Sequence, residues 1–248
     1  MTDTSANRID KLRQIKRDAM SFKYQIEEQV SAAISAGSLH DLKALMLTIK
    51  ETNQMYPFPE PESKKIQTIK NTMITYNTYS RIAAKNGGLD SLNIHLISQR
   101  YTSLIDEAPS LEYINKHIYF QMFKEYCQAV KQFSTTGYSS VMKEIVSYIS
   151  ENLTSDMTLT SVAALYGIHP VHLARKFKQE TGNTFIGYVN LQRVNLAKYY
   201  FHCDEFQMSE VADLSGFNSH SYFTKVFKKI TGLTPTQYIR VIPSAGAR

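Results

Sequence analysis

Apolar residues recur every three or four positions along most of the chain, which is the spacing of amphipathic α-helices. In the first half, this spacing predicts helices near residues 8–35, 39–54, 64–86, 90–107 and 111–133. The pattern is broken by turn-forming residues at Gly37-Ser38, from Pro57 to Ser63, at Gly87-Gly88 and at Pro109-Ser110. No segment shows the convincing alternation of apolar and polar residues that is typical of a strand. The first half is therefore predicted to be helical throughout.

The second half follows the same rule in shorter elements. Residues 141–152 predict a first helix. Thr158 is placed to cap the start of the next helix, because a side-chain hydroxyl is favoured at that position. Gly167 is placed to stop the same helix, because glycine is favoured just after a helix end. Pro170 suits the first turn of a third helix, which Gly182 ends.

A longer helix is predicted from Phe185 to Cys203, and Pro235 opens a final short one. The stretch from Ser134 to Tyr138 is small and polar, so we expect it to link two domains. The predicted fold is all-α, with a helical regulatory or dimerisation domain at 1–134 and a second helical domain at 139–241.

Part of the second domain is present twice, since residues 159–188 recur with changes as residues 208–238. The residues that return 49 positions later are Val162, Ala163, Leu165 and Gly167. Those that return 50 positions later are Phe177, Lys178, Thr181, Gly182 and Tyr188. Each copy comprises a short helix, a glycine turn and a second helix with basic residues, which is the helix-turn-helix pattern. Two copies on a linker helix predict a protein that reads successive major grooves of double-stranded DNA.

Composition limits the class of protein without naming its partner. The chain has 248 residues, suiting two modest domains, and its 43% hydrophobic content is ample for packed cores. There is no apolar run of membrane-spanning length and no secretory signal at the N-terminus. Cys127 and Cys203 are the only cysteines, and neither belongs to a CxxC motif, so we expect a cytoplasmic protein.

Net charge permits a nucleic-acid partner but does not locate it. The formal charge is +6, and residues 141–248 hold 11 Lys and Arg against 8 Asp and Glu. The first 140 residues have the same excess, with 17 basic against 14 acidic residues. The repeat, rather than basicity, assigns DNA binding to the second domain.

The repeated positions, together with the helix between them, resemble the AraC/XylS family of bacterial transcription regulators. The positions that match are Ala163, Gly167, Ile168, Phe177, Lys178, Thr181, Gly182, Tyr188, Arg193, Ala197, Ala212, Gly216, Phe217, Phe227, Lys228, Thr231, Gly232, Pro235 and Tyr238. The resemblance covers residues 139–241 and implies contact with double-stranded DNA and RNA polymerase. Two positions depart from it, because Tyr199-Tyr200 replace the usual Leu-Leu pair and Gln207 replaces the usual capping Ser or Asp. The first half shows no sugar-binding barrel and looks like the helical N-terminal region of other members.

The resemblance also places the DNA contacts. In each copy two apolar residues face inward, Leu173 with Phe177 and Phe223 with Phe227. The candidates for base contacts are Val171, Ala174, Arg175, His220, Ser221, Tyr222, Thr224 and Lys225. Arg175 is the foremost, because a guanidinium pairs twice with guanine. The candidates for phosphate contacts are Lys178, Ser219, Lys228, Lys229 and Thr231.

Residues outside the repeat leave several alternatives open. The aromatic stripe Tyr113, Ile114, His117, Phe120, Phe123, Tyr126 and Cys127 suits a core, a ligand pocket or a dimer face. Arg81, Arg100 and His95 suit an anionic effector or a plain surface. We expect the first half to form a homodimer, to bind a small-molecule or peptide effector, or to do both. The histidines His169, His172, His202 and His220 have no carboxylate or cysteine at ligand spacing, so neither metal nor cofactor is expected.

Two other functions are compatible with a helical chain that contains a helix-turn-helix repeat. Some DNA-repair alkyltransferases carry a similar DNA-binding module, but their chemistry needs a cluster of cysteines that two cysteines 76 residues apart do not supply. No nucleotide-binding glycine motif, HExxH or GxSxG is present, so no enzyme is expected. A helical protein–protein module with an inactive DNA-binding remnant is the other rival, and the basic residues of both copies argue against it.

Overall fold

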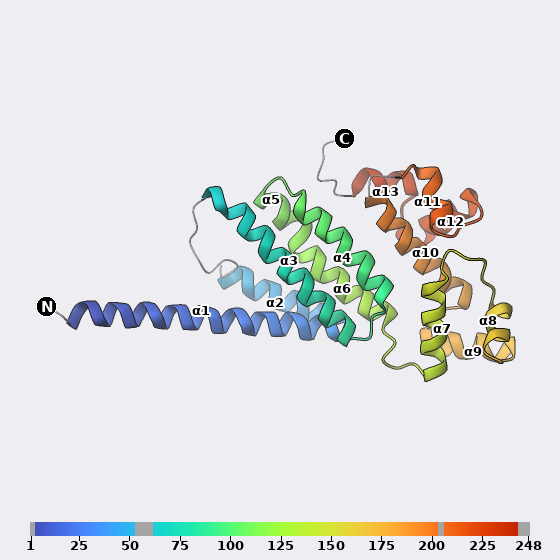
Figure 1. Ribbon diagram of the computed structural model, residues 1–248, viewed down its shortest axis with the longest axis horizontal. Coiled ribbons are helices and arrows are strands. Elements are labelled where there is room, and N and C mark those ends of the chain that lie inside the picture. The colour runs from blue at the N-terminus through green and yellow to red at the C-terminus, as the bar shows by residue number, and fades with distance from the viewer. Residues whose placement is uncertain (1–2, 53–61, 203–205, 243–248) are drawn as a thin grey trace. The chain divides into compact units, whose positions relative to one another are not determined.

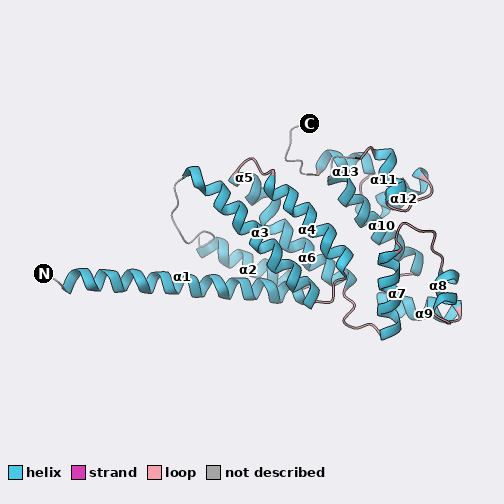
Figure 2. Ribbon diagram, in the orientation of Figure 1, coloured by secondary structure: helices cyan, strands magenta, loops and turns pink. Residues whose placement is uncertain are grey.

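The computed structural model describes residues 3–52, 62–202 and 206–242, and every regular element in these ranges is a helix (Figures 1 and 2). The predicted all-α fold is thereby confirmed. The chain divides into two compact units. The first combines Met1–Gly87 with Ser110–Gln132, and the second combines Gly88–Pro109 with Phe133–Arg248. Among the described helices, none combines the length and the apolar character that crossing a membrane requires.

The first unit is a bundle of long helices (Figure 1). Its elements are α1 (Asp3–Ser35), α2 (Leu39–Thr52), α3 (Glu62–Asn86), α5 (Leu111–Tyr113), a π-helix (Ile114–Tyr119) and α6 (Phe120–Phe133), whose last residue is grouped with the second unit. Helix α1 packs on α2 and α3, and α6 contacts both α1 and α3. Tyr126 of α6 is fully buried and its hydroxyl donates to Asn77 Oδ1 of α3 at 2.8 Å. The break expected from Pro57 to Ser63 lies mostly outside the described residues.

The helix predicted over 111–133 is not uniform. Its first turns widen into the π-helix Ile114–Tyr119 before α6 begins. A π-helix adds a residue to each turn, so the aromatic stripe does not keep one face through this segment. Phe123 and Tyr126 are buried in the core, whereas the rings of Tyr113 and His117 contact each other at a tilt of 41°, with centroids 4.8 Å apart.

The second unit is arranged around one central helix. Its elements are α4 (Ser91–Asp106), α7 (Ser140–Glu151), α8 (Leu159–Leu165), α9 (Pro170–Thr181), α10 (Phe185–His202), α11 (Met208–Leu214), α12 (His220–Thr231) and α13 (Pro235–Val241). Helix α10 contacts α4, α9, α11 and α12 and is buried around most of its surface. The two repeated copies therefore both pack on this one helix rather than being joined by a flexible linker.

Helix α4 packs on α10 through buried polar side chains. The Asn93 amide donates to Gln192 Oε1 at 2.8 Å and to Asp90 Oδ2 at 2.7 Å. Gln192 in turn donates to the Tyr188 hydroxyl at 3.2 Å, and Asn195 donates to Asn93 Oδ1 at 3.3 Å. Buried amides without such partners would be costly, so this network fixes one register of α4 on α10. Helix α4 lies within the first half of the sequence, yet it belongs to the second unit.

Candidate nucleic-acid interface

The first helix-turn-helix consists of α8, a glycine turn and α9, with local signals that match the sequence. The Thr158 hydroxyl accepts the Ser161 N–H at 3.0 Å and the Ser161 hydroxyl accepts the Thr158 N–H at 3.1 Å, so the predicted cap is confirmed as a reciprocal pair. Gly167 has a φ of +63°, which favours glycine, and the space around it is open. Pro170 occupies the first turn of α9 as predicted.

Helix α9 has a buried back and an exposed front. Leu173 and Phe177 are fully buried, and Phe177 packs edge-on against Tyr188 of α10 with ring centroids 5.5 Å apart. On the front, Val171 is 69% exposed and Arg175 is exposed, while Ala174 is half-buried beside them. The Arg175 guanidinium lies 3.4 Å from the ring of His172, one turn earlier on the same helix.

The second helix-turn-helix, α11 and α12, keeps this plan with different details. The predicted absence of a hydroxyl cap at Gln207 is offset by Glu210, whose carboxylate accepts the Gln207 N–H at 2.8 Å. Gly216 has a φ of +83° and no open space around it. A Cβ there would lie 2.8 Å from the Leu153 carbonyl oxygen and 3.0 Å from Arg193 Nε.

Helix α12 is seated by aromatic side chains. Phe223 and Phe227 are buried in a cluster with Phe201 and Phe217 that also includes Val194, Ala197, Val211, Ala212 and Val226. The predicted base-contact residues on its front, His220, Ser221, Tyr222, Thr224 and Lys225, are all exposed. The Tyr222 hydroxyl accepts a hydrogen bond of 2.8 Å from the Asn190 amide of α10, so this tyrosine is oriented from outside its own helix.

The predicted phosphate contacts fall into two kinds. Lys178, Lys228 and Lys229 are exposed in the last turns of α9 and α12. Ser219 caps the start of α12, accepting the Tyr222 N–H at 3.4 Å. The Thr231 hydroxyl donates to Phe227 O at 2.8 Å and accepts the Leu233 N–H at 3.2 Å, which makes it part of the helix ending.

Arg193 of α10 joins the two copies, a role that sequence reasoning missed. Its Nε donates to Leu153 O and its Nη2 donates to Ser155 O, both at 2.9 Å, in the loop before α8. Its guanidinium carbon lies 5.9 Å from the ring centroid of Phe217 in the second copy. We call these contacts the Arg193 clamp. Burial lowers the pKa of Arg193 from its ordinary value, although an arginine stays charged at neutral pH. The acceptors are backbone atoms about 40 residues away, so no local sequence signal reveals them.

Titratable side chains lie near the other end of α10. Burial, followed by the nearby charges of Arg100 and Lys198, lowers the pKa of His202 to about 3, so this imidazole is neutral at pH 7. Arg100 is buried on α4, and the ring of His95 lies 6.4 Å from that of Tyr199. Arg81 belongs to the first unit, so the three side chains considered for an anionic effector are divided between the units. In the described ranges, no group of three or more His, Cys, Asp or Glu is arranged to hold a metal ion.

Comparison with known proteins identifies the family of the two helix-turn-helix motifs. A family model described as a helix-turn-helix domain matches residues 151–240. The chain is 35% identical over 94 residues to the bifunctional transcriptional activator/DNA repair enzyme AdaA of Bacillus subtilis, which covers 38% of this chain and 44% of AdaA. It is 31% identical over 98 residues to the arabinose operon regulatory protein of Escherichia coli, covering 39% of this chain and 34% of that protein. Residues 151–240 form an AraC-type helix-turn-helix domain.

The matched region makes up only part of the length of the relatives, as it does of this chain. The regulatory protein PocR of Salmonella typhimurium is 29% identical over 147 residues, which is 56% of this chain and 48% of PocR. The matches thus span less than half of each of these three relatives. The resemblance stated from the sequence is confirmed for the C-terminal region, and that region is the one found in DNA-binding transcription regulators.

Proposed function

We propose that this protein is a sequence-specific transcription regulator that reads two successive major grooves of double-stranded DNA with α9 and α12. The observation that carries the proposal is the common build of these two helices. Each has a buried apolar back seated on α10 and an exposed, partly basic front. The Arg193 clamp ties the copies together, which favours two reading heads held at a fixed separation.

Within this interface the contacts divide by chemistry. Arg175, Val171 and Ala174 on α9 are proposed to meet base edges, with His220, Ser221, Tyr222, Thr224 and Lys225 on α12. Lys178, Lys228, Lys229 and Ser219 are proposed to meet phosphates, which supply affinity rather than sequence preference. The Thr231 phosphate contact stays a prediction, and we expect its effect to be small because the hydroxyl already completes the helix ending.

The first unit is proposed to modulate DNA binding, as an effector site, a homodimer interface or both, and RNA polymerase is the proposed downstream partner. A ligand shifts DNA affinity only by its differential affinity for the two states of the protein. Dimerisation instead raises affinity for paired sites through effective concentration.

A DNA-repair activity such as the one named for AdaA is disfavoured by Cys127. Its thiol donates to Ala33 O at 3.6 Å and is fully buried in the core of the first unit. Burial raises its pKa to about 11, so it is a poor thiolate nucleophile at neutral pH. Cys203 lies outside the described residues. We therefore propose a regulator that is not an enzyme.

Footprinting tests the two-groove reading. DNA bound by the full chain would be selected from a random pool and then probed for protection. Because neighbouring major grooves on one face lie about 34 Å apart, we expect two protected tracts about one helical turn apart. Protection of one short tract would contradict the proposal, and so would an enriched pool without sequence preference.

A further inference from the structure

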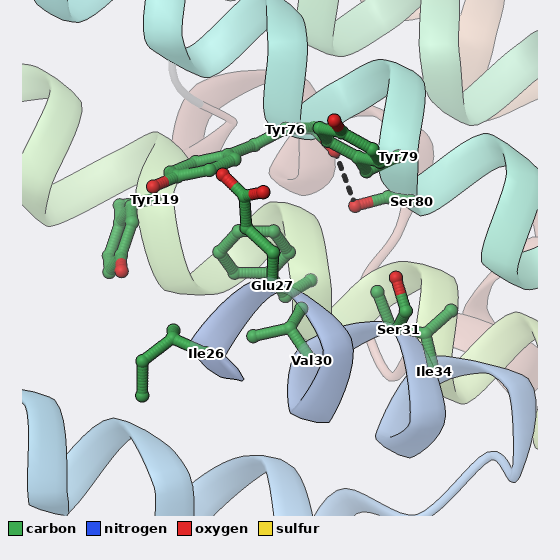
Figure 3. Close-up of a pocket in the computed structure, with 10 residues that line it drawn as sticks. Ile26, Glu27, Val30, Ser31, Ile34, Tyr76, Tyr79, Ser80 and Tyr119 are labelled. Atoms are coloured by element: carbon green, nitrogen blue, oxygen red, sulfur yellow. Dashed lines mark hydrogen bonds between the residues drawn. The ribbon is translucent and has the colours of Figure 1, made fainter. Parts of the chain in front are cut away.

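The first unit contains a cavity that the DNA-binding proposal does not use. It lies between α1, α3 and the segment from the π-helix to α6, and has about 340 Å³ of empty space including its open mouth (Figure 3). Its lining is mostly apolar and aromatic, and includes Glu27, Val30, Ile34, Tyr76, Tyr119 and Phe123. We call it the aromatic cavity.

Three of the rings contact one another. The centroid of Phe123 lies 5.8 Å from that of Tyr76 and 5.4 Å from that of Tyr119, and the two tyrosine centroids are 6.5 Å apart. The ring planes are tilted or perpendicular to one another rather than stacked. Tyr119 is the last residue of the π-helix, and π-helical turns occur frequently at functional sites.

The carboxylate of Glu27 lines the aromatic cavity. Figure 3 shows the Glu27 side chain rising from α1 toward the Tyr76 ring. The Glu27 side chain is only 11% exposed, and Lys23 Nζ lies 3.7 Å from its Oε1. That separation is too long for a hydrogen bond, and the lysine side chain is 46% exposed. A carboxylate so far removed from water is stabilised by a cation close to it.

We propose that the aromatic cavity binds a small organic ammonium ion. The ring faces attract a cation through their quadrupoles, and the Glu27 carboxylate supplies the countercharge. Small alkyl groups on the nitrogen would pack against Val30 and Ile34, which line the same space. An ammonium ligand displaces Lys23 from the carboxylate, and the exposed lysine returns to water at little cost. A regulatory effect of this ligand rests on the proposed function of the first unit, whereas binding itself does not.

The sign of the charge distinguishes this site from the anionic effector site that Arg81, Arg100 and His95 suggest. Arg81, Arg100 and His95 would have suited an anion, and none of them lines the aromatic cavity. Glu27 would repel an anion in a site of low polarity. A neutral ligand of the same shape would fill the cavity but gain nothing from the carboxylate or from cation–π attraction.

Calorimetric titration of the full chain tests the proposal with two probes of the same shape. Choline carries a quaternary ammonium group, and 3,3-dimethylbutan-1-ol replaces its nitrogen with carbon. At constant ionic strength we expect choline to bind about tenfold or more tightly than the alcohol. Equal affinity would leave only an apolar pocket and would overturn the proposal, as would no choline binding at tens of millimolar.

Three variants of α1 locate the site. Glu27→Gln should weaken choline binding by about tenfold, because it removes the countercharge and little volume. Glu28→Gln is the matched control, since Glu28 is the next residue and is exposed, and it should leave affinity unchanged. Lys23→Gln should tighten binding by removing the competing cation. An equal loss in the Glu27 and Glu28 variants, or no change in either, would place the site elsewhere.

Thermal unfolding and DNA titration complete the test. A Glu27→Gln chain that melts like wild type and has lost choline binding supports the site. Phe123→Leu serves as a second variant, expected to reduce the preference for choline over the alcohol. If choline binds at Glu27 but leaves DNA affinity unchanged, the site stands and regulation through it is refuted. If no DNA sequence is selected at all, the proposed function fails independently of the cavity.

Discussion

The two helix-turn-helix copies share one plan but stand in different surroundings. The turn of the first copy, at Gly167, has no atom within 4 Å of where a Cβ would be. The turn of the second, at Gly216, is pressed against the loop at Leu153 and against Arg193. A glycine is needed in the first copy only for its φ, and in the second for φ and for space. The two motifs are similar in sequence, but only the second one has its turn packed against other parts of the fold, namely the loop before α8 and Arg193 of α10.

The exposed faces of α9 and α12 also differ in how firmly they are held. Residue 175 is an arginine, and Lys225 occupies the equivalent place 50 positions later. The Arg175 guanidinium has a neighbour on its own helix, His172, whereas Tyr222 of the second copy is oriented by Asn190 of α10. Helix α12 is therefore held by α10 at its exposed front as well as at its buried back.

Substituting the two turn glycines should show the largest difference between the two copies, as a difference in the stability that each variant loses. Gly167→Ala should lower the free energy of unfolding only by the strain of a left-handed backbone, about 1–2 kcal/mol. Alanine at Gly216 adds overpacking against Leu153 and Arg193, so we expect a total loss of about 2–5 kcal/mol. Urea unfolding of both variants measures the difference. Equal losses would mean that the second turn is not confined as described.

Removing the Arg193 clamp should uncouple the copies. Arg193→Ala leaves two backbone acceptors unpaired, and we expect a stability loss of about 2–3 kcal/mol. Wild type should strongly disfavour a DNA site with one base pair inserted between the two contacted grooves, and the variant should disfavour it less. Arg240→Ala, at an exposed arginine of α13, is the control. A spacing penalty unchanged in Arg193→Ala would show that the clamp does not set the separation.

Arg175 and Lys228 should separate base from phosphate contacts. Arg175→Ala is expected to cost about 1–3 kcal/mol of binding free energy and to relax preference at one base pair. Lys228→Ala should weaken binding to every sequence and lower the salt dependence by about one counterion. Titrations at several salt concentrations, on target and altered DNA, measure both. Similar behaviour of the two variants would contradict the assigned division.

Acid should weaken the second unit through His202. Its folded pKa of about 3 lies below the ordinary value of 6.5, so the unfolded chain takes up the proton first. Stability is then full above pH 6.5 and falls as pH decreases toward the folded pKa, by at most about 1.4 kcal/mol per pH unit. Chemical unfolding between pH 7 and 5, compared with His202→Gln, isolates this contribution. The variant should show the flatter pH dependence.

Local features of the fold followed from the sequence because they are caused locally. Thr158, Pro170 and Gly182 act on the helix ends at which they stand, and the structure places all three as predicted. The π-helix was missed, since one added residue per turn leaves no clear mark on an apolar pattern of four to six residues. The association of α4 with α10 was also missed. It depends on Asn93 meeting Gln192, 99 residues later, and polarity at those positions gave no hint of burial.

The candidate interface was predictable to a similar extent. Repetition marked α9 and α12 and the apolar backs that seat them, such as Phe177 and Phe227. The sequence could not show which exposed residues of α9 and α12 are oriented by other helices. Asn190 and Tyr222, for example, are 32 residues apart and meet only in the folded protein. The aromatic cavity illustrates the same limit. Glu27 looks like an ordinary charge on a long helix until α3 and α6 bring their rings to it.

The placement of α4 has a consequence for how such a chain can be cut and recombined. Because residues 88–109 belong to the second unit, the polypeptide passes between the units at three points, near residues 87, 109 and 132. A fragment that begins at residue 139 would carry the reading helices but expose the face of α10 that Asn93 and its neighbours cover. Exchange of regulatory halves between related genes would meet the same obstacle at a junction near residue 139. A junction before residue 88 would keep α4 with α10, and the segment 110–132 would have to be exchanged along with the rest of the first unit.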